Sequence, residues 1–158
     1  MAPSNGDVRI IITGGAISSY DKLSFEYHKV YNPPGGRTYT SYLLFTNAGT
    51  AVDHQRFRFS DLEKEEEGFT CRLKMTEGPY KDYWLDSKDG YPQAWSSSTC
   101  RWRFIDKGPH YYWQQVPTDK FVKVTAEEVA PKAFYLRAFG GGEPSADDES
   151  ARFNILEW

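Results

Sequence analysis

One short motif recurs three times along the chain, and its spacing constrains the fold more than any other feature. Each copy has an arginine, an aromatic residue, a polar residue and then an apolar residue. The copies are Arg56-Phe57-Arg58-Phe59, Arg101-Trp102-Arg103-Phe104 and Arg152-Phe153-Asn154-Ile155. The first two arginines are 45 residues apart, and the second and third are 51 apart. Such a near-regular repeat indicates three similar structural units that pack together.

A second element lies upstream of each copy of the motif. It reads Tyr42-Leu43-Leu44, Tyr83-Trp84-Leu85 and Phe134-Tyr135-Leu136, and its central residue precedes the arginine by 13, 17 and 17 residues. Two elements that recur three times in the same order argue against a chance match of short aromatic patterns.

Between these motifs the chain favours strands over helices. Helical periodicity is nearly absent, whereas short alternation of apolar and polar residues is common. The clearest case is Phe69–Thr76, and residues 7–13 show a similar apolar face that predicts a first strand. Residues 14–37 are predicted as a long connection. The aromatic fraction of 16% agrees with an all-β chain, because aromatic residues favour strands and fill small barrels.

Three units, each with several short strands, are typical of a β-trefoil. In that fold each pseudo-repeat has four strands, and the units together form a six-stranded barrel capped by hairpins, which leaves no open sheet edge. We expect one domain over residues 1–158, with units of about 7–59, 60–104 and 105–158. The arginine-aromatic motif is the last strand of each unit, and Phe57, Trp102 and Phe153 are predicted core residues. A seven-stranded sandwich is the alternative, but it predicts no three-fold spacing.

Two local assignments are less direct. The opening strand of the third unit is either His110–Val116 or Phe121–Val124, and we choose the first because it leaves the shorter loop after Phe104. The acidic run Asp61–Glu67 is interpreted as a solvated loop or a single helical turn.

Composition excludes several function classes. The net charge is −3 and the basic residues are scattered, so no basic face is expected for nucleic acid. No apolar run approaches the ~20 residues of a membrane helix, and the N-terminus lacks the pattern of a secretory signal. We expect a cytoplasmic protein, or one released without a signal peptide on tissue damage. Cys71 and Cys100 are then expected as reduced thiols, although a disulfide between neighbouring barrel strands is geometrically possible.

The sequence lacks the residue patterns that carry most enzyme chemistry. His28, His54 and His110 have no partner at ligand spacing, so no metal site is predicted. The chain has no nucleophile elbow, phosphate loop or dinucleotide fingerprint. We therefore predict no cofactor and a binding protein rather than an enzyme.

A β-trefoil suggests sugar binding as one function. Ricin-type lectins carry Gln-x-Trp in the last strand of each unit, and only the copy beginning at Gln55 keeps the glutamine here. The literal match Gln93-Ala94-Trp95 lies out of frame, where Trp95 is either a core residue or an exposed one. If exposed, Trp95, Tyr91 and Tyr80 can stack on sugars.

The chain resembles the mycocypins, fungal β-trefoil inhibitors of cysteine proteases that include the clitocypins and macrocypins. Thr99-Cys100-Arg101-Trp102-Arg103-Phe104 and the following Tyr111-Tyr112 resemble a strand pair of that family. Pro33-Pro34-Gly35-Gly36-Arg37-Thr38-Tyr39 resembles its Pro-Gly-Gly stretch, and Arg152-Phe153-Asn154-Ile155-Leu156 resembles its closing strand. The resemblance spans the whole chain thinly, and its motifs are largely structural.

The resemblance implies a protease inhibitor whose loops block the cleft of papain-like cysteine proteases. In the family, the loops between strands one and two and between strands three and four enter the cleft. The matching positions here are Gly14, Gly15, Ala16, Ile17 and Ser18 in the first loop, and Asp53 and His54 near the second. A glycine at the tip permits close backbone approach. Gly14-Gly15 is equally interpretable as an ordinary turn.

A further loop is a candidate for a second protease class. In the family the equivalent loop can act on legumain or trypsin-like enzymes, and related fungal trefoils inhibit serine or aspartic proteases. Here that loop contains Gly78, Pro79, Tyr80 and Lys81. Lys81 can enter a trypsin-like pocket, or it is an ordinary solvated lysine, and no asparagine is present for legumain. We expect a monomer that inhibits proteases, with a sugar-binding lectin as the alternative and a trefoil scaffold for another partner as a third hypothesis.

Overall fold

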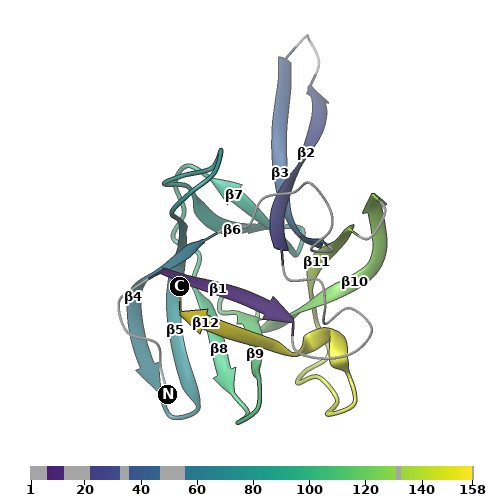
Figure 1. Cartoon of the computed structure of the whole chain (residues 1–158). Helices are drawn as coiled ribbons and strands as arrows, with labels where there is room; N and C mark the ends of the chain where they lie inside the picture. Colours follow the sequence, from purple (N-terminus) through teal and green to yellow (C-terminus); the bar gives the residue numbers. More distant parts are fainter. Residues whose placement is uncertain (1–6, 13–21, 33–35, 47–55, 131–132, 158) are drawn as a thin grey trace.

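The computed structural model describes residues 7–12, 22–32, 36–46, 56–130 and 133–157. These residues form strands and one short 3₁₀ helix, and none of the described residues lies in an α-helix (Figure 1). Within the described part of the chain, no helix has the length and apolar character needed to cross a membrane.

The strands are short to medium in length and follow one another closely. Their bounds are β1 Asp7–Ile12, β2 Lys22–Asn32, β3 Gly36–Thr46, β4 Phe57–Glu65, β5 Gly68–Met75, β6 Trp84–Lys88, β7 Tyr91–Trp95, β8 Trp102–Asp106, β9 Tyr111–Gln115, β10 Lys120–Ala130, β11 Ala133–Phe139 and β12 Phe153–Glu157, with the 3₁₀ helix η1 at Glu149–Ala151.

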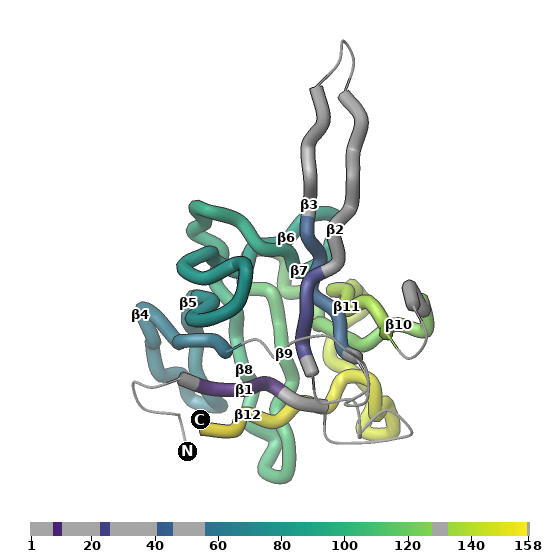
Figure 2. The backbone as a smooth tube through the Cα atoms, turned by 45° about the horizontal axis from the view of Figure 1, so that its top comes forward, coloured from purple at the N-terminus to yellow at the C-terminus, as the bar shows by residue number. Residues whose placement is uncertain are grey.

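Six of these strands close into a ring. Antiparallel pairing joins β1 to β4, β4 to β5, β5 to β8, β8 to β9, β9 to β12, and β12 back to β1. Strand β1 near the N-terminus and β12 near the C-terminus lie side by side in both ribbon views (Figures 1 and 2). The ring therefore closes only when the two ends of the chain meet. Closure satisfies the backbone groups that an open sheet edge would expose.

The other six strands form three hairpins, β2–β3, β6–β7 and β10–β11. The hairpins meet one another through their second strands, because β3 pairs with β7 at Tyr42 and Gln93 and with β11 at Phe45 and Phe134. Ring and hairpins together form an all-β, barrel-like fold, as the sequence predicts.

The core confirms the role of the repeated motif. Phe57, Trp102 and Phe153 are each 0% exposed. The indole N–H of Trp102 donates a hydrogen bond to the Leu85 carbonyl at 3.1 Å, which satisfies its one polar atom. The ring of Trp113 packs edge-on against Trp102 at 5.5 Å between centroids and against Phe153 at 5.4 Å. Aromatic side chains of three distant segments thus fill one contiguous core.

Several predicted strands are confirmed at nearly the expected bounds. Strand β1 covers the predicted residues 7–13 except the last, and β5 covers Phe69–Thr76 with a shift of one residue. Strand β9 within His110–Val116 is a ring strand, whereas Phe121–Val124 belongs to the hairpin strand β10. Of the two candidate segments, the one chosen from the sequence therefore lies in the ring.

Two local predictions are wrong. Residues 14–37 are not a plain connection, because Lys22–Asn32 is the long strand β2, paired along its length with β3. The acidic run Asp61–Glu67 is neither a loop nor a helical turn, because its first five residues continue β4 and only Glu66 and Glu67 form the turn into β5. The outward carboxylates are compatible with a strand because arginines from neighbouring segments meet them: Arg103 of β8 contacts Glu65 at 2.6 Å, and Arg72 of β5 contacts Asp61 at 3.3 Å.

The second repeated element does not occupy equivalent strands. Tyr42 and Tyr135 lie in β3 and β11, the second strands of their hairpins, but Trp84 lies in β6, the first strand of its hairpin. The equivalent strand in the middle of the chain is β7. The match at Tyr83-Trp84-Leu85 therefore reflects similar composition and does not mark a repeated position.

Candidate functional site

The sequence points to three loops, and the structure describes one of them. Gly14, Gly15, Ala16, Ile17 and Ser18 lie between β1 and β2, outside the described residues, and so do Asp53 and His54 between β3 and β4. Gly78, Pro79, Tyr80 and Lys81 lie in the loop between β5 and β6, which we call the β5–β6 loop, residues 76–83.

Backbone hydrogen bonds hold the β5–β6 loop in one shape. The Lys81 N–H bonds the Gly78 carbonyl at 3.2 Å, and the Tyr83 N–H bonds the Tyr80 carbonyl at 3.0 Å, so two turns follow each other. At the base, Met75 and Tyr83 pair at 2.8 Å. Pro79 fixes its own φ at the start of the first turn. Gly78 has φ 81°, a left-handed conformation that glycine adopts without steric cost.

Tyr80 anchors this loop from inside. Its side chain is 7% exposed, and its ring packs against Phe25 at 4.8 Å and Tyr83 at 5.6 Å. Its hydroxyl forms a buried hydrogen bond with the hydroxyl of Ser41 in β3. The expectation that Tyr80 is exposed and free to stack on a sugar is therefore wrong, because the ring fills the space between the loop and the β2–β3 hairpin.

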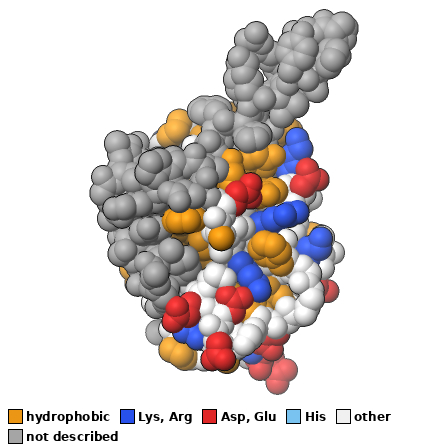
Figure 3. Space-filling model, turned by 90° about the vertical axis from the view of Figure 1, so that its right-hand side faces the viewer, with side chains coloured by type: hydrophobic (Ala, Val, Ile, Leu, Met, Phe, Trp, Pro, Cys, Tyr) orange, Lys and Arg blue, Asp and Glu red, His pale blue; other side chains and the backbone are white. Residues whose placement is uncertain are grey.

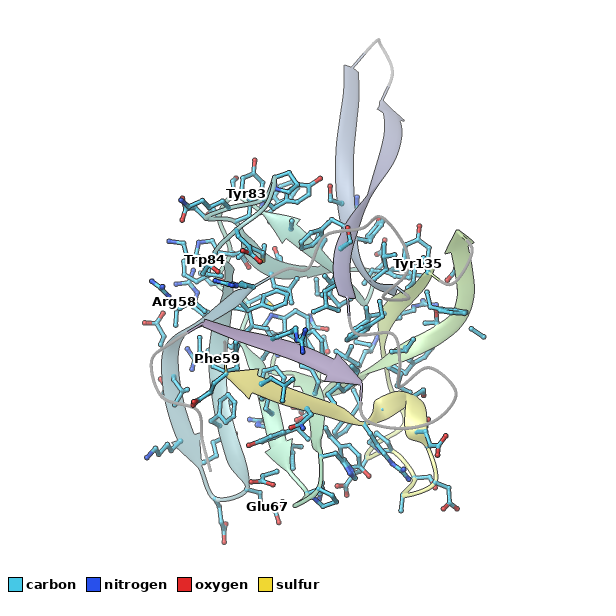
Figure 4. The ribbon with its side chains drawn as sticks, in the orientation of Figure 1. Arg58, Phe59, Glu67, Tyr83, Trp84 and Tyr135 are labelled. Atoms are coloured by element: carbon cyan, nitrogen blue, oxygen red, sulfur yellow. The ribbon has the colours of Figure 1, made fainter. Side chains whose placement is uncertain are left out.

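The rest of the loop faces solvent. Gly78, Pro79, Lys81 and Asp82 are exposed, and Tyr83 is 38% exposed. Figure 4 places Tyr83 at the opposite end of the molecule from Glu67, which lies in the β4–β5 turn. Because the Lys81 N–H is already used within the turn, Lys81 does not offer the extended backbone that a protease pairs with in a substrate. Its side chain remains available.

Next to this loop, two tryptophans lie opposite each other on β6 and β7. Trp84 pairs with Trp95, which is 48% exposed. The guanidinium of Arg72 stands 3.8 Å from the centre of the Trp84 ring, and the Lys74 ammonium is 5.3 Å away. Cations thus cover Trp84 and leave Trp95 as the open ring. The interpretation of Trp95 as a core residue is wrong, and its interpretation as an exposed ring is confirmed.

The segment that follows Trp95 helps to line a polar pocket of about 430 Å³. The pocket is lined by residues of β6, the β7–β8 connection and the segment around the end of β9, namely Asp86, Ser97, Ser98, Thr99, Cys100, Gln115 and Pro117. A carboxylate, an amide and three hydroxyls therefore face one hollow. The sequence prediction missed this pocket. Its one signal was the hydroxyl run Ser96-Ser97-Ser98-Thr99 between two strands, but Asp86 and Gln115 come from strands that only the fold brings near.

The cysteine at this pocket is not set up as a nucleophile. Both cysteines are free, with Cys71 buried and Cys100 half-buried. Burial, and then the neighbouring Asp86, raise the pKa of Cys100 to about 12, so its thiol stays protonated at neutral pH. Burial also raises the pKa of Cys71, against the opposing effect of Arg101. Reactive cysteines need the opposite environment, one that favours the thiolate.

Among the described residues, no group of three or more His, Cys, Asp or Glu side chains is placed to hold a metal ion.

Neither a scan against models of known protein families nor a search of curated protein sequences finds a match to this chain.

Proposed function

We propose that this chain is a β-trefoil protein that inhibits proteases through its surface loops. The pairing pattern supports the fold assignment. Each of three successive stretches runs ring strand, hairpin, ring strand, and the ring order β1, β4, β5, β8, β9, β12 repeats that arrangement three times. The arginine-aromatic motifs at β4, β8 and β12 then close the three units.

One observation carries the functional proposal, namely the internal hydrogen bonding of the β5–β6 loop. Its tip residues Pro79 and Lys81 face solvent, while Tyr80 between them is buried and hydrogen-bonded to Ser41. A loop already held in one conformation loses little entropy on binding, which favours tight and reversible association. Because this loop is not extended like a substrate, a protease would not find one of its peptide bonds in the conformation needed for cleavage.

The target class rests on the resemblance to the mycocypins. On that basis, papain-like cysteine proteases are the first targets, bound through Gly14–Ser18 and the Asp53-His54 segment. The β5–β6 loop is the candidate contact for a second class, aspartic or serine proteases, with Lys81 as the side chain for a trypsin-like pocket.

Titration of papain with the purified protein tests the first target. We expect stoichiometric and reversible loss of activity. The Gly15→Trp variant should abolish that inhibition and leave thermal unfolding nearly unchanged, because added bulk at a wedge tip prevents close approach. Unaltered inhibition by Gly15→Trp would move the contact to another loop. Absence of inhibition at micromolar protein would remove papain-like enzymes as targets.

The second target class is tested with trypsin and pepsin. If the β5–β6 loop enters a trypsin-like pocket, Lys81→Ala should lose trypsin inhibition and keep papain inhibition. Lys88→Ala, which removes another exposed lysine in β6, is the matched control and should change neither. Equal trypsin inhibition by wild type and Lys81→Ala would assign the contact elsewhere.

Sugar binding is the second candidate function, and two observations favour it: Trp95 is exposed, and the polar pocket begins two residues further along the chain at Ser97. A saccharide stacks its apolar face on an aromatic ring and hydrogen-bonds its hydroxyls to carboxylates, amides and hydroxyls. A glycan array with wild type, Trp95→Ala and Asp86→Asn tests it. Binding that both variants lose supports the site, and an array on which the wild type binds nothing removes the hypothesis.

A further inference from the structure

Three tyrosines from three different hairpins surround a small hollow. They are Tyr42 in β3, Tyr91 in β7 and Tyr135 in β11. Their ring centroids are 5.3 Å apart for Tyr42 and Tyr91, 5.7 Å for Tyr91 and Tyr135, and 6.0 Å for Tyr42 and Tyr135. All three pairs are tilted or edge-to-face, with interplanar angles of 56°, 72° and 90°. We call this arrangement, completed by Glu127, the tyrosine cage.

The three rings contact one another, and a partly open hollow lies against them. The hollow has a volume of about 130 Å³ and is lined by the three rings and Glu127. Aromatic side chains that only pack a core interdigitate and leave few voids larger than one water molecule. This hollow has room for about four water molecules at their liquid volume. Tyr135 is 6% exposed and forms the floor, whereas Tyr42 and Tyr91 are half-buried and leave the hollow reachable from outside.

A local irregularity in β10 aims the carboxylate at the cage. Val124 pairs with Leu136, and the next pair is Glu128 with Phe134, so β10 carries three residues where β11 carries one. The Thr125 hydroxyl donates to the Tyr135 carbonyl at 2.9 Å and accepts the Glu127 N–H at 3.1 Å. Bulges of this kind redirect a side chain. Here the result is a contact of 3.3 Å between the Tyr91 hydroxyl and the Glu127 carboxylate.

The electrostatics of the cage favour a positive guest. The faces of the three rings carry negative charge density, and the Glu127 carboxylate adds a full negative charge at the rim. Burial, and then the nearby Asp89, raise the pKa of Tyr42, so its phenol stays neutral at neutral pH.

Cations already stack on rings along this side of the molecule. The guanidinium of Arg137 is 5.0 Å from the centre of Tyr91 and 5.7 Å from that of Phe139, and the Lys123 ammonium is 6.0 Å from Phe139. Figure 3 shows basic and acidic side chains interspersed with hydrophobic ones on the side that carries β10 and β11. Arg137 lines the neighbouring hollow with Asp89 and Lys120, and it is not among the residues that line the cage.

We propose that the tyrosine cage binds a small quaternary or fully methylated ammonium group. Such a group has an apolar surface of methyls that contacts the rings and a diffuse positive charge that the rings and Glu127 stabilise. It carries no N–H donors, whereas a Lys ammonium carries three, and the described lining offers these donors the carboxylate of Glu127 and the phenol oxygens. The proposal does not depend on protease inhibition, because the cage uses none of the residues proposed for that function.

The first test uses tetramethylammonium as the probe. We expect the methyl protons of the ion to shift upfield in NMR on addition of the protein, because they enter the shielding region of the rings, with a dissociation constant on the order of 1 mM or below. Choline and a peptide carrying trimethyllysine present the same group and are titrated in parallel, to show whether a small molecule or a modified side chain is the better source. The unmethylated peptide should bind at least about tenfold more weakly.

A neutral analogue separates charge recognition from simple burial. 3,3-Dimethylbutan-1-ol has the shape of choline without its charge, and we expect it to bind at least about tenfold more weakly than choline. Equal binding of the two compounds, or no saturable binding of any methylated ammonium up to about 10 mM, would overturn the proposal.

Variants locate the site. Tyr91→Leu removes one half-buried ring and should weaken binding about tenfold, and Glu127→Gln should weaken it several-fold by removing the charge. The matched controls are Tyr83→Leu and Glu66→Gln, which change a tyrosine and a glutamate elsewhere on the surface and should bind like wild type. Unfolding midpoints are measured for all four variants. If Glu127→Gln and Tyr91→Leu bind like the controls while folded, the cage is not the site.

Discussion

The strand ring and the β5–β6 loop use aromatic residues in opposite ways. In the ring, the aromatic residue of each repeated motif is fully buried, and three such residues from distant segments meet in one core. In the loop, one buried tyrosine, Tyr80, holds a short segment whose other residues face solvent. The comparison teaches that repetition in this chain marks the core, whereas the segments that break the repetition carry the exposed and chemically varied surface.

Of the variants that test this comparison, truncation of Trp102 should cause the largest loss of unfolding free energy. Trp102→Ala removes a fully buried indole together with its hydrogen bond to Leu85, and such truncations cost about 3–5 kcal/mol of unfolding free energy. Trp95→Ala, which truncates an exposed side chain, should change the free energy of unfolding by less than about 0.5 kcal/mol. Urea denaturation of both variants measures the difference. Equal stability of the two would show that the ring does not depend on the repeated aromatic residues.

Gly68 offers a second way to break the ring. It opens β5 with φ 135°, and a Cβ at this position would lie 1.9 Å from the Phe104 carbonyl oxygen of β8. Gly68→Ala should therefore force β5 and β8 apart and cost at least roughly 1–3 kcal/mol. Gly108→Ala is the matched control, because Gly108 also has a positive φ, 93°, but no atom lies within 4 Å of the added Cβ. A smaller loss at Gly68 than at Gly108, from thermal or urea unfolding, would contradict the close approach.

Tyr80 is the point at which the loop itself can be loosened. Tyr80→Phe keeps the packing against Phe25 but removes the hydroxyl bonded to the buried Ser41, for an expected loss of about 1 kcal/mol. The amide protons of Lys81 and Tyr83 should then exchange faster with solvent. Tyr83→Phe changes an exposed hydroxyl and should leave both stability and exchange nearly as they are. Unchanged exchange in Tyr80→Phe would mean that the backbone turns alone hold the loop.

At neutral pH the smallest expected effect is that of the Cys100 thiol, which changes stability only at alkaline pH. Burial raises the pKa of Cys100 to about 12, whereas a thiol in the unfolded chain titrates near about 8.5. Below that pH both states keep the proton, so the contribution of this thiol is constant. Above it the unfolded state releases the proton first, and the free energy of unfolding falls as the pH rises toward the folded value. Cys100→Ala should reduce this fall in urea titrations between about pH 8 and 10, and an identical fall would assign it to other groups.

Much of the ring could be predicted from the sequence because its signal is local and repeated. Alternation along Phe69–Thr76 and the arginine-aromatic motifs identified β5, β4, β8 and β12 without knowledge of their partners. Strand β2 was missed because the turn signals on either side of it, Gly14-Gly15 and Pro33-Pro34-Gly35-Gly36, dominated the prediction for residues 14–37. The acidic end of β4 was missed because its charges are matched by basic partners that lie far away in the sequence, as when Arg103 of β8 pairs with Glu65, 38 residues earlier.

The sequence by itself determined the all-β class, the buried aromatic residues of the repeated motifs and the loops that differ between them. Each follows from the preferences of residues close together in the chain, since strand alternation and turn chemistry act over a few positions. Only the tertiary structure decided that Tyr80 is buried, that Trp95 is open, and that Tyr42, Tyr91 and Tyr135 enclose a hollow with Glu127 at its rim. Those outcomes depend on how the three hairpins meet through β3, β7 and β11, and these pairings join residues that lie far apart in the chain.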